Sequence, residues 1–183
     1  MVADPAAAFS FCSEDRVECG QVGNLANATE DRSHFGAWAI SSSPLILSFN
    51  LSDPSRMDRA WPIVSNRRVL AVNQRWAGSP GRRVTLSADG WQAWAKPMGG
   101  KSYAIFLMNG GEQTVAASLP LHNVSAAFAS TSGVCARDLY TGKAVPALKA
   151  RAPLAATLGV HDSAFYCAWP SADGGCGGAN DCP

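Results

Sequence analysis

The first third of the chain combines a helical pattern with a short apolar strand pattern. Phe35, Trp38 and Ala39 recur at the i, i+3, i+4 spacing of one helix face. Thr29 is the expected N-cap of this helix. The continuous apolar run Leu45–Phe49 is typical of a parallel strand buried on both faces. Helix followed by apolar strand is the repeating step of an α/β barrel, so we expect the end of such a barrel here.

Two further short helices are predicted before a clear break in the pattern. The first begins at Asp53-Pro54 and ends at Pro62, and the second runs from Asn66 to about Asn73. The segment Ala77–Gly81 then gathers glycine, serine and proline, which interrupt regular structure. We therefore expect a domain boundary at this segment.

Beyond the boundary the apolar positions follow the period of two that is typical of strands. Asn109-Gly110-Gly111 supplies the residues of a hairpin turn. About eight short strands without a long helix indicate an antiparallel β-sandwich. The strands that the pattern identifies are 91–96, 103–108, 115–119, 126–129, 134–139, 152–158 and 164–169.

The expected fold class is therefore an α/β remnant plus an all-β part. Residues 1–77 are expected to form the last strands and helices of a (β/α)8 TIM barrel, which is incomplete because a barrel cannot close from one or two strands. Residues 78–170 are expected to form the sandwich, and residues 171–183 a Gly- and Cys-rich tail. The strand edge left open in the barrel part predicts poor solubility, relieved by deleting the residues before about 78.

Composition excludes several classes of partner. The net charge of +1 lacks the excess of positive charge that is typical of nucleic-acid-binding proteins, so no nucleic-acid partner is expected. No segment approaches the ~18 apolar residues of a membrane span, so no membrane partner is expected. No C-x-x-C pair is present, and neither a metal nor another cofactor is expected. The oligomeric state is left open.

Cysteines and glycosylation sequons point to the secretory pathway. Sequons begin at Asn27, Asn50 and Asn123, which are possible glycosylation sites. Cys135 and Cys167 lie on predicted strands of one domain and could be bridged across the sheets, while Cys176–Cys182 and Cys12–Cys19 could close short loops. Six cysteines nevertheless allow fifteen connectivities. The start of the chain lacks the pattern of a signal peptide, so we expect it to be part of a longer secreted polypeptide.

Five motifs in register resemble the C-terminal part of glycoside hydrolase family 27, the α-galactosidase-like family. The resemblance covers residues 13–169. The motifs are HFGAWAI at 34–40, SPLIL at 43–47, NRRVLAVNQ at 66–74, WQAWAKP at 91–97 and RDLY at 137–140.

This resemblance implies a retaining glycosidase that removes terminal α-linked galactose from an α-galactoside substrate, in a lysosomal, vacuolar or extracellular location. Retaining chemistry uses two carboxyl groups ~5 Å apart. The family's two catalytic aspartates precede the part of the family seen here, so no catalytic residue is assigned and the chain alone is expected to be inactive. Asp15 aligns with a sugar-contacting aspartate, whereas Arg16, Asn50 and Arg75 depart from the family pattern.

Other interpretations remain open at the level of sequence. Asp15 could be an ordinary solvated loop charge. His161-Asp162 could be the histidine and aspartate of a catalytic triad. The sequence contains no G-x-S-x-G motif for the nucleophile, so we expect these two residues to be ordinary turn residues. The six tryptophans could form a sugar-stacking surface, although large aromatic side chains on strands usually fill a core. The alternative function is a non-catalytic carbohydrate-binding or structural β-sandwich module.

Overall fold

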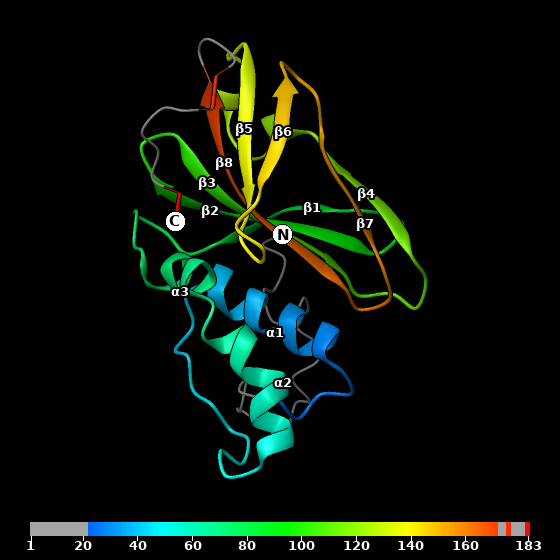
Figure 1. Cartoon of the computed structure of the whole chain (residues 1–183). Helices are drawn as coiled ribbons and strands as arrows, with labels where there is room; N and C mark the ends of the chain where they lie inside the picture. Colours follow the sequence, from blue (N-terminus) through cyan, green and yellow to red (C-terminus); the bar gives the residue numbers. More distant parts are fainter. Residues whose placement is uncertain (1–21, 172–174, 177–181) are drawn as a thin grey trace.

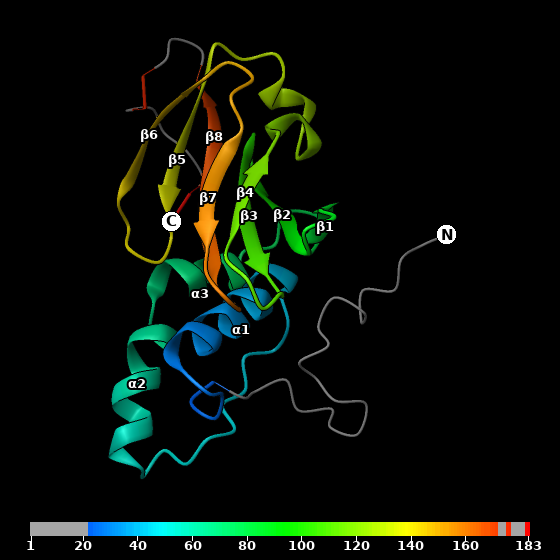
Figure 2. The same cartoon turned by 90° about the vertical axis from the view of Figure 1, so that its right-hand side faces the viewer.

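The computed structural model describes residues 22–171, 175–176 and 182–183. Three helices pack at one face of a β-sandwich (Figures 1 and 2). The helices are α1 (Ala28–Ser41), α2 (Pro54–Val64) and α3 (Arg67–Gln74). Helix α1 lies next to the sheet, and α2 lies on the far side of α1. The strands are β1 (Arg82–Leu86), β2 (Trp91–Gly99), β3 (Ser102–Asn109), β4 (Val115–Leu119), β5 (Gly133–Asp138), β6 (Ala144–Lys149), β7 (Leu154–Leu158) and β8 (Ser163–Ser171).

Each helix begins at a side chain that accepts hydrogen bonds from the first turn. Asn27, rather than Thr29, caps α1, because its Oδ1 accepts the N–H of Glu30 over 3.0 Å. Asp53 and Asn66 cap α2 and α3 in the same way. Pro62, expected to end α2, lies inside that helix, which continues to Val64.

The sandwich consists of two antiparallel sheets, as the sequence predicted. The larger sheet has the strand order β1-β2-β3-β8-β5-β6, and the smaller pairs β4 with β7. The β3–β4 connection at Asn109-Gly110-Gly111 therefore passes from one sheet to the other, so the predicted hairpin is wrong. The predicted strand 126–129 is also wrong, since Ala126–Phe128 form a 3₁₀ turn capped by Ser125. The strands that the pattern missed, β1 and β6, are the two edges of the larger sheet.

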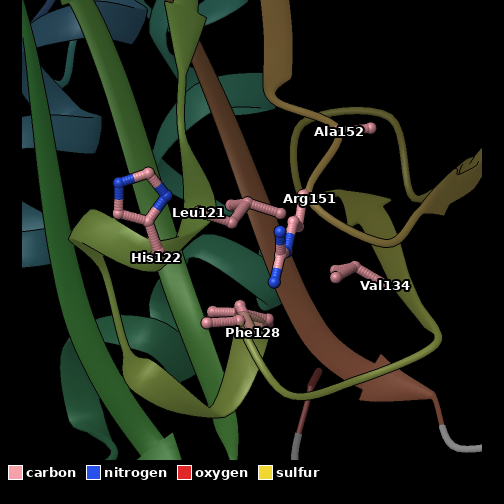
Figure 3. Close-up of a pocket in the computed structure, with 7 residues that line it drawn as sticks. Leu121, His122, Phe128, Val134, Arg151 and Ala152 are labelled. Carbon is pink, nitrogen blue, oxygen red and sulfur yellow. The ribbon is translucent and has the colours of Figure 1, made fainter.

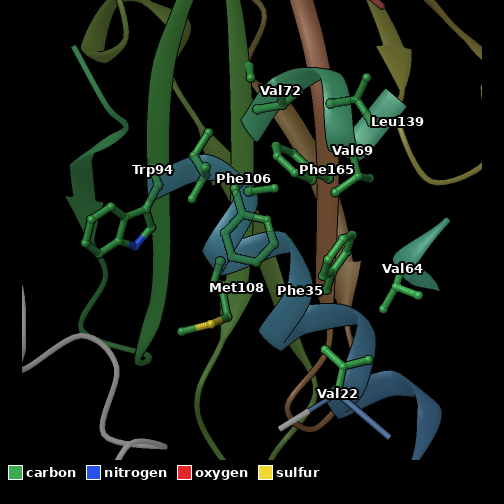
Figure 4. Close-up of a cluster of buried hydrophobic side chains, with 14 of the residues drawn as sticks. Val22, Phe35, Val64, Val69, Val72, Trp94, Phe106, Met108, Leu139 and Phe165 are labelled. Atoms are coloured by element: carbon green, nitrogen blue, oxygen red, sulfur yellow. The ribbon is translucent and has the colours of Figure 1, made fainter. Parts of the chain in front are cut away.

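Strand β3 separates two hydrophobic cores. Phe106 and Met108 point to the helices, where they meet Phe35 of α1 and Phe165 of β8 (Figure 4). The alternate residues of β3 point to the smaller sheet. The core between the sheets includes Trp91, Ile105, Leu107, Leu119, Phe128, Leu154 and Leu158. Because successive side chains of a strand face opposite sides, both faces of β3 are buried, which explains its uninterrupted apolar sequence.

The segment Leu45–Phe49 forms neither a helix nor a strand, and it bends at Phe49, which corrects the expected buried parallel strand. Phe49 is buried, whereas Ile46 is 67% and Leu47 39% exposed. A strand needs a neighbour to bond its backbone N–H and C=O groups, and none of the sheets in the described part of the chain contains this segment. The barrel character of this region therefore shows only in the helices and in the unpaired apolar run.

The helices cover one face of the larger sheet. This arrangement changes the expectation that deleting the residues before about 78 improves solubility. Phe35, Ile40, Val69 and Val72 of the helices share one core with Phe165 of the sandwich. Deleting the residues before 78 would uncover that face, so improved solubility is no longer expected of the deletion. The division at residue 77/78 stays a prediction.

Candidate functional site

The structure describes only some of the residues singled out by sequence. Asp15 lies outside the described residues, as do Cys12 and Cys19. Asn27, Asn50 and Asn123 are all exposed.

Two disulfides join the sandwich to the C-terminal tail, and they differ from the expected pairs. Cys135 is bonded to Cys176 and Cys167 to Cys182. The suggested Cys135–Cys167 bridge is wrong because both residues lie in the larger sheet, on the neighbouring strands β5 and β8. There Cys135 is opposite Trp169, two residues away from Cys167. Diagonal neighbours of this kind lie about 7–8 Å apart, too far for a disulfide.

We call the polar contacts of α1 and α3 with β2, β8 and the turn after β5 the joint between helices and sandwich. The sequence motifs meet at this joint. At the start of α3, the Nδ2 of Asn66 donates to the carbonyl oxygens of Leu139 and Tyr140 over 3.2 and 3.1 Å. The Nε of Arg68 donates to the Leu139 oxygen over 3.0 Å. The NRRVLAVNQ motif therefore binds the RDLY motif directly.

At the other end of α3, Asn73 connects two more motifs. Its Nδ2 donates to the carbonyl oxygen of Ser43 over 2.8 Å and to that of Trp38 over 3.3 Å. These oxygens belong to the start of the SPLIL segment and to the HFGAWAI helix. The contacts fix the start of the 43–47 segment relative to α1 and α3.

Lys96 of the WQAWAKP motif completes the joint. It is fully buried and lies on the helix side of β2. Its Nζ donates to Ser42 Oγ over 2.6 Å, to the Asn73 oxygen over 3.2 Å and to the carbonyl oxygen of Val72. Burial lowers the pKa of Lys96 to about 8. The ammonium group thus binds the unsatisfied carbonyl oxygens at the end of α3, where the helix dipole favours a cation.

A second polar cluster lies where α1 meets β8. Tyr140 Oη and Ser33 Oγ each lie within hydrogen-bond distance of Ser163 Oγ, at 2.8 and 2.9 Å. Arg32 pairs with Asp162 over 2.7 Å and lies over the Tyr140 ring. Burial raises the pKa of Tyr140 above its usual range, so its hydroxyl stays protonated.

His161 lies in the turn between β7 and β8, as expected. Its Nδ1 is 3.3 Å from Glu30 Oε1 and its Nε2 is 3.2 Å from Glu112 Oε1. Its neighbour Asp162 pairs with Arg32. The histidine therefore connects the start of α1 with two turns of the sandwich through polar contacts to two carboxylates.

A pocket of about 440 Å³ lies on the sandwich, away from the joint (Figure 3). Leu121, Phe128 and Val134 form its apolar lining, and Arg151 and His122 add nitrogen atoms. None of its lining residues is an aspartate or glutamate, so it cannot supply the carboxylate pair of a retaining glycosidase. Within the described ranges, His, Cys, Asp and Glu form no group of three or more that could hold a metal ion.

Sequence reasoning missed Lys96, Asn66 and Asn73 as joint residues. A signal was present for Lys96, because a lysine within a buried strand pattern requires polar partners. For the two asparagines, position at a helix end indicated capping but not the contact across to the sandwich.

Comparison with known proteins agrees with the architecture. Residues 88–168 match the family described as "Alpha galactosidase C-terminal beta sandwich domain". The chain is 34% identical to an α-galactosidase of Coffea arabica over 157 residues, which cover 85% of this chain and 39% of that protein. It is 32% identical to an α-galactosidase of Oryza sativa subsp. japonica over 157 residues, covering 86% of this chain and 35% of the relative.

Solved structures show the same fold. α-Galactosidase I from Mortierella vinacea superposes with a TM-score of 0.70 at 23% identity, over 80% of this chain and 36% of that one. The α-galactosidase of Saccharomyces cerevisiae, solved with raffinose, gives a TM-score of 0.70 at 24% identity, over 82% of this chain and 46% of that chain. The chain thus spans less than half the length of these relatives. None of its described helices is long and apolar enough to cross a membrane.

Proposed function

Since the chain belongs to glycoside hydrolase family 27, whose C-terminal part it matches, we propose that it supplies this part of a retaining glycosidase that removes terminal α-galactosyl residues. The observation that carries the proposal is the joint. Four motifs of the resemblance meet there through Lys96, Asn66 and Asn73. The fifth, RDLY, accepts hydrogen bonds from Asn66 at the same joint.

The role of this chain in that enzyme is positional. Retaining hydrolysis needs one carboxyl group as nucleophile and one as acid and base, about 5 Å apart. The described carboxylates of Asp31, Asp53 and Asp162 are engaged in ion pairs with arginines instead. The joint holds the start of the 43–47 segment against the sandwich. In an α/β barrel such a segment completes the sheet at whose carboxyl edge substrate binds.

Asp15 is proposed to contact the sugar in the complete enzyme, and the location is proposed to be lysosomal, vacuolar or extracellular. The motif alignment supports the first of these proposals. The two disulfides support the second, because stable disulfides are typical of secreted proteins. The substrate is proposed to be an α-galactoside, in line with the names of the relatives.

A chimaera tests the proposal. This chain replaces the 157 matched residues of the Coffea arabica α-galactosidase, and hydrolysis of an aryl α-galactoside is measured. We expect turnover by the chimaera and none by the 183-residue chain alone. An Asp15→Asn chimaera is expected to show a raised KM. A folded chimaera without turnover would contradict the proposal, as would turnover by the isolated chain.

Binding by the isolated chain distinguishes the proposed function from the alternative, a non-catalytic carbohydrate-binding module. Such a module binds immobilised galactosides by itself. The proposed function predicts negligible retention, because the sugar site needs residues that the sandwich does not supply. Retention of the isolated chain that free galactose competes away would favour the binding module.

A further inference from the structure

The pocket on the sandwich has an apolar floor made of buried side chains. Leu121 and Phe128 come from the two 3₁₀ turns after β4, and Val134 comes from the start of β5. All three side chains are buried. The ring of Phe128 packs against the ring of Tyr103 on β3, with 5.8 Å between the centroids. The floor is therefore part of the close-packed core between the two sheets, which holds its shape.

The pocket lies on the side of the larger sheet that faces away from the helices. Its floor belongs to the core between the sheets, whereas the helices pack on the opposite face, where Phe106 and Phe165 lie. The 43–47 segment, which is proposed to complete the barrel, begins at α1 and α3 on that opposite face. The pocket is therefore a feature of the sandwich itself, and completion of the barrel does not account for it.

Arg151 supplies a positive charge to the pocket. It lies in the turn between β6 and β7, and Figure 3 shows its side chain directed toward Phe128. Within the described ranges, no carboxylate pairs with its guanidinium group. In the helical part, by contrast, Arg32, Arg56 and Arg59 each pair with an aspartate. The N–H donors of Arg151 are therefore available to a ligand in the pocket.

The backbone at Arg151 has a conformation that favours glycine. The N–H of Ala152 donates to the carbonyl oxygen of Lys149 over 3.0 Å and closes a four-residue turn. Arg151 occupies the third position of this turn with a φ of 65°. Glycine or asparagine is usual at such a position, because a Cβ makes the left-handed region unfavourable. Backbone conformation therefore does not explain an arginine here, whereas a role of its side chain in the pocket does.

The sequence around the pocket is almost free of carboxylates. Residues 113–161 contain every lining residue, and Asp138 is the single acidic residue among them. Its Oδ1 is engaged in the turn after β5, where it accepts the N–H groups of Tyr140 and Thr141 over 2.8 and 3.0 Å. The lysines and arginines of the same stretch are Arg137, Lys143, Lys149 and Arg151. An anion that approaches this face therefore meets attraction and little repulsion.

We propose that the pocket binds a small organic carboxylate with an apolar body. The planar guanidinium of Arg151 matches a carboxylate through two parallel N–H···O bonds, and the floor matches the apolar body. The volume of about 440 Å³ lies within the range of about 300–1,000 Å³ that is usual for small-molecule sites. A sugar fits less well, because an apolar floor leaves its hydroxyl groups without partners. The inference is independent of the proposed glycosidase activity.

Isothermal titration calorimetry of the whole chain with 2-naphthoate tests the proposal. The matched ligand is 2-naphthamide, which has a similar shape and no charge, and D-galactose is the competitor. We expect saturable binding of the carboxylate at one site, binding of the amide weaker by about tenfold or more, and no displacement by galactose. Equal affinity for acid and amide, displacement by galactose, or no binding of 2-naphthoate would overturn the proposal.

Two substitutions of Arg151 separate its charge from its backbone. Arg151→Gln keeps the positive φ and removes the charge, whereas Arg151→Gly also relaxes the turn. Both should weaken binding of 2-naphthoate by about tenfold or more, while the melting temperature of Arg151→Gly stays at or above that of wild type. Lys143→Gln, which makes the same change of charge between β5 and β6, is the control and should bind like wild type. Tight binding by Arg151→Gln would contradict the role of the guanidinium.

A substitution that fills the pocket tests where the ligand binds. Ala129 lines the pocket and is exposed, so Ala129→Trp adds volume there without entering the core. We expect this variant to keep the melting temperature of wild type and to lose binding of 2-naphthoate. Unchanged binding by Ala129→Trp would show that the carboxylate binds elsewhere and would overturn the assignment to this pocket.

Discussion

The ammonium group of Lys96, on a central part of the sheet, donates a hydrogen bond to the carbonyl oxygen of Asn73 at the end of α3, over 3.2 Å. The same Nζ also binds the Val72 oxygen and Ser42 Oγ. One buried side chain of the sandwich thereby satisfies the ends of two helices.

Lys96→Met should destabilise the chain by about 1–3 kcal/mol, the usual cost of leaving buried polar groups without partners. Methionine fills a similar volume but cannot donate to the oxygens of Val72 and Asn73. Urea unfolding followed by tryptophan fluorescence measures the change. Lys101→Met, at an exposed lysine of the β2–β3 turn, is the control and should change little. Equal effects of the two substitutions would rule out a special role for Lys96.

The same lysine should make stability depend on pH in the alkaline range. Its pKa is lowered to about 8 in the folded chain, against 10.5 for an ordinary lysine. Between these two pH values the unfolded chain binds more protons, so the Lys96 contribution to stability rises with pH. We expect the difference in unfolding free energy between wild type and Lys96→Met to grow from pH 8 to pH 10. A constant difference would contradict the lowered pKa.

Gly36→Ala should destabilise the chain even though alanine favours helices. A Cβ at Gly36 would lie 2.5 Å from a ring carbon of Phe106 and 2.7 Å from the Tyr140 hydroxyl. Overpacking of a core costs about 1–3 kcal/mol, against a gain of about 1 kcal/mol in helix propensity. Gly110→Ala, where a Cβ meets no atom within 4 Å, is the control. A raised melting temperature for Gly36→Ala would show that α1 does not pack this closely.

The two disulfides should differ in their effect on stability. Cys135–Cys176 spans 41 residues and Cys167–Cys182 spans 15. Because a longer loop loses more entropy on closure, Cys176→Ser should cost about 0.9 kcal/mol more than Cys182→Ser. Denaturant unfolding of the two variants measures this order. The reverse order would show that strain or contacts in the tail outweigh loop entropy.

Removing the helices should reduce solubility rather than improve it. Without residues 1–77, the sheet face that carries Trp94, Phe106, Met108 and Phe165 is exposed to water. The variant to compare with this deletion is the double substitution Ile46→Ser and Leu47→Ser in the full chain. It replaces exposed apolar side chains without exposing the core. The soluble fraction after expression should fall for the deletion and rise for the double variant. A soluble, monomeric deletion would argue that the sandwich is independent of the helices.

Local patterns were sufficient for much of the fold. Phe35 and Trp38 identified the buried face of α1, and the apolar run of β3 identified a central strand, because burial repeats with the period of the element itself. The edge strands β1 and β6 were missed, since an edge strand is half solvated and its alternation is weak. The candidate site was predicted less well, because its residues act across the joint.

The sequence by itself determined most of the element types, the antiparallel sandwich and the family resemblance, since these depend on spacing along the chain. Only the tertiary structure decided which groups meet, such as Lys96 with Val72 and Asn73, or Cys135 with Cys176. It also decided that Ile46 is exposed. Such contacts join residues far apart in sequence, and their geometry depends on how whole layers pack. A hydrophobic run such as Leu45–Phe49 specifies a preference for burial, but only a neighbouring strand can turn that preference into a strand of a sheet.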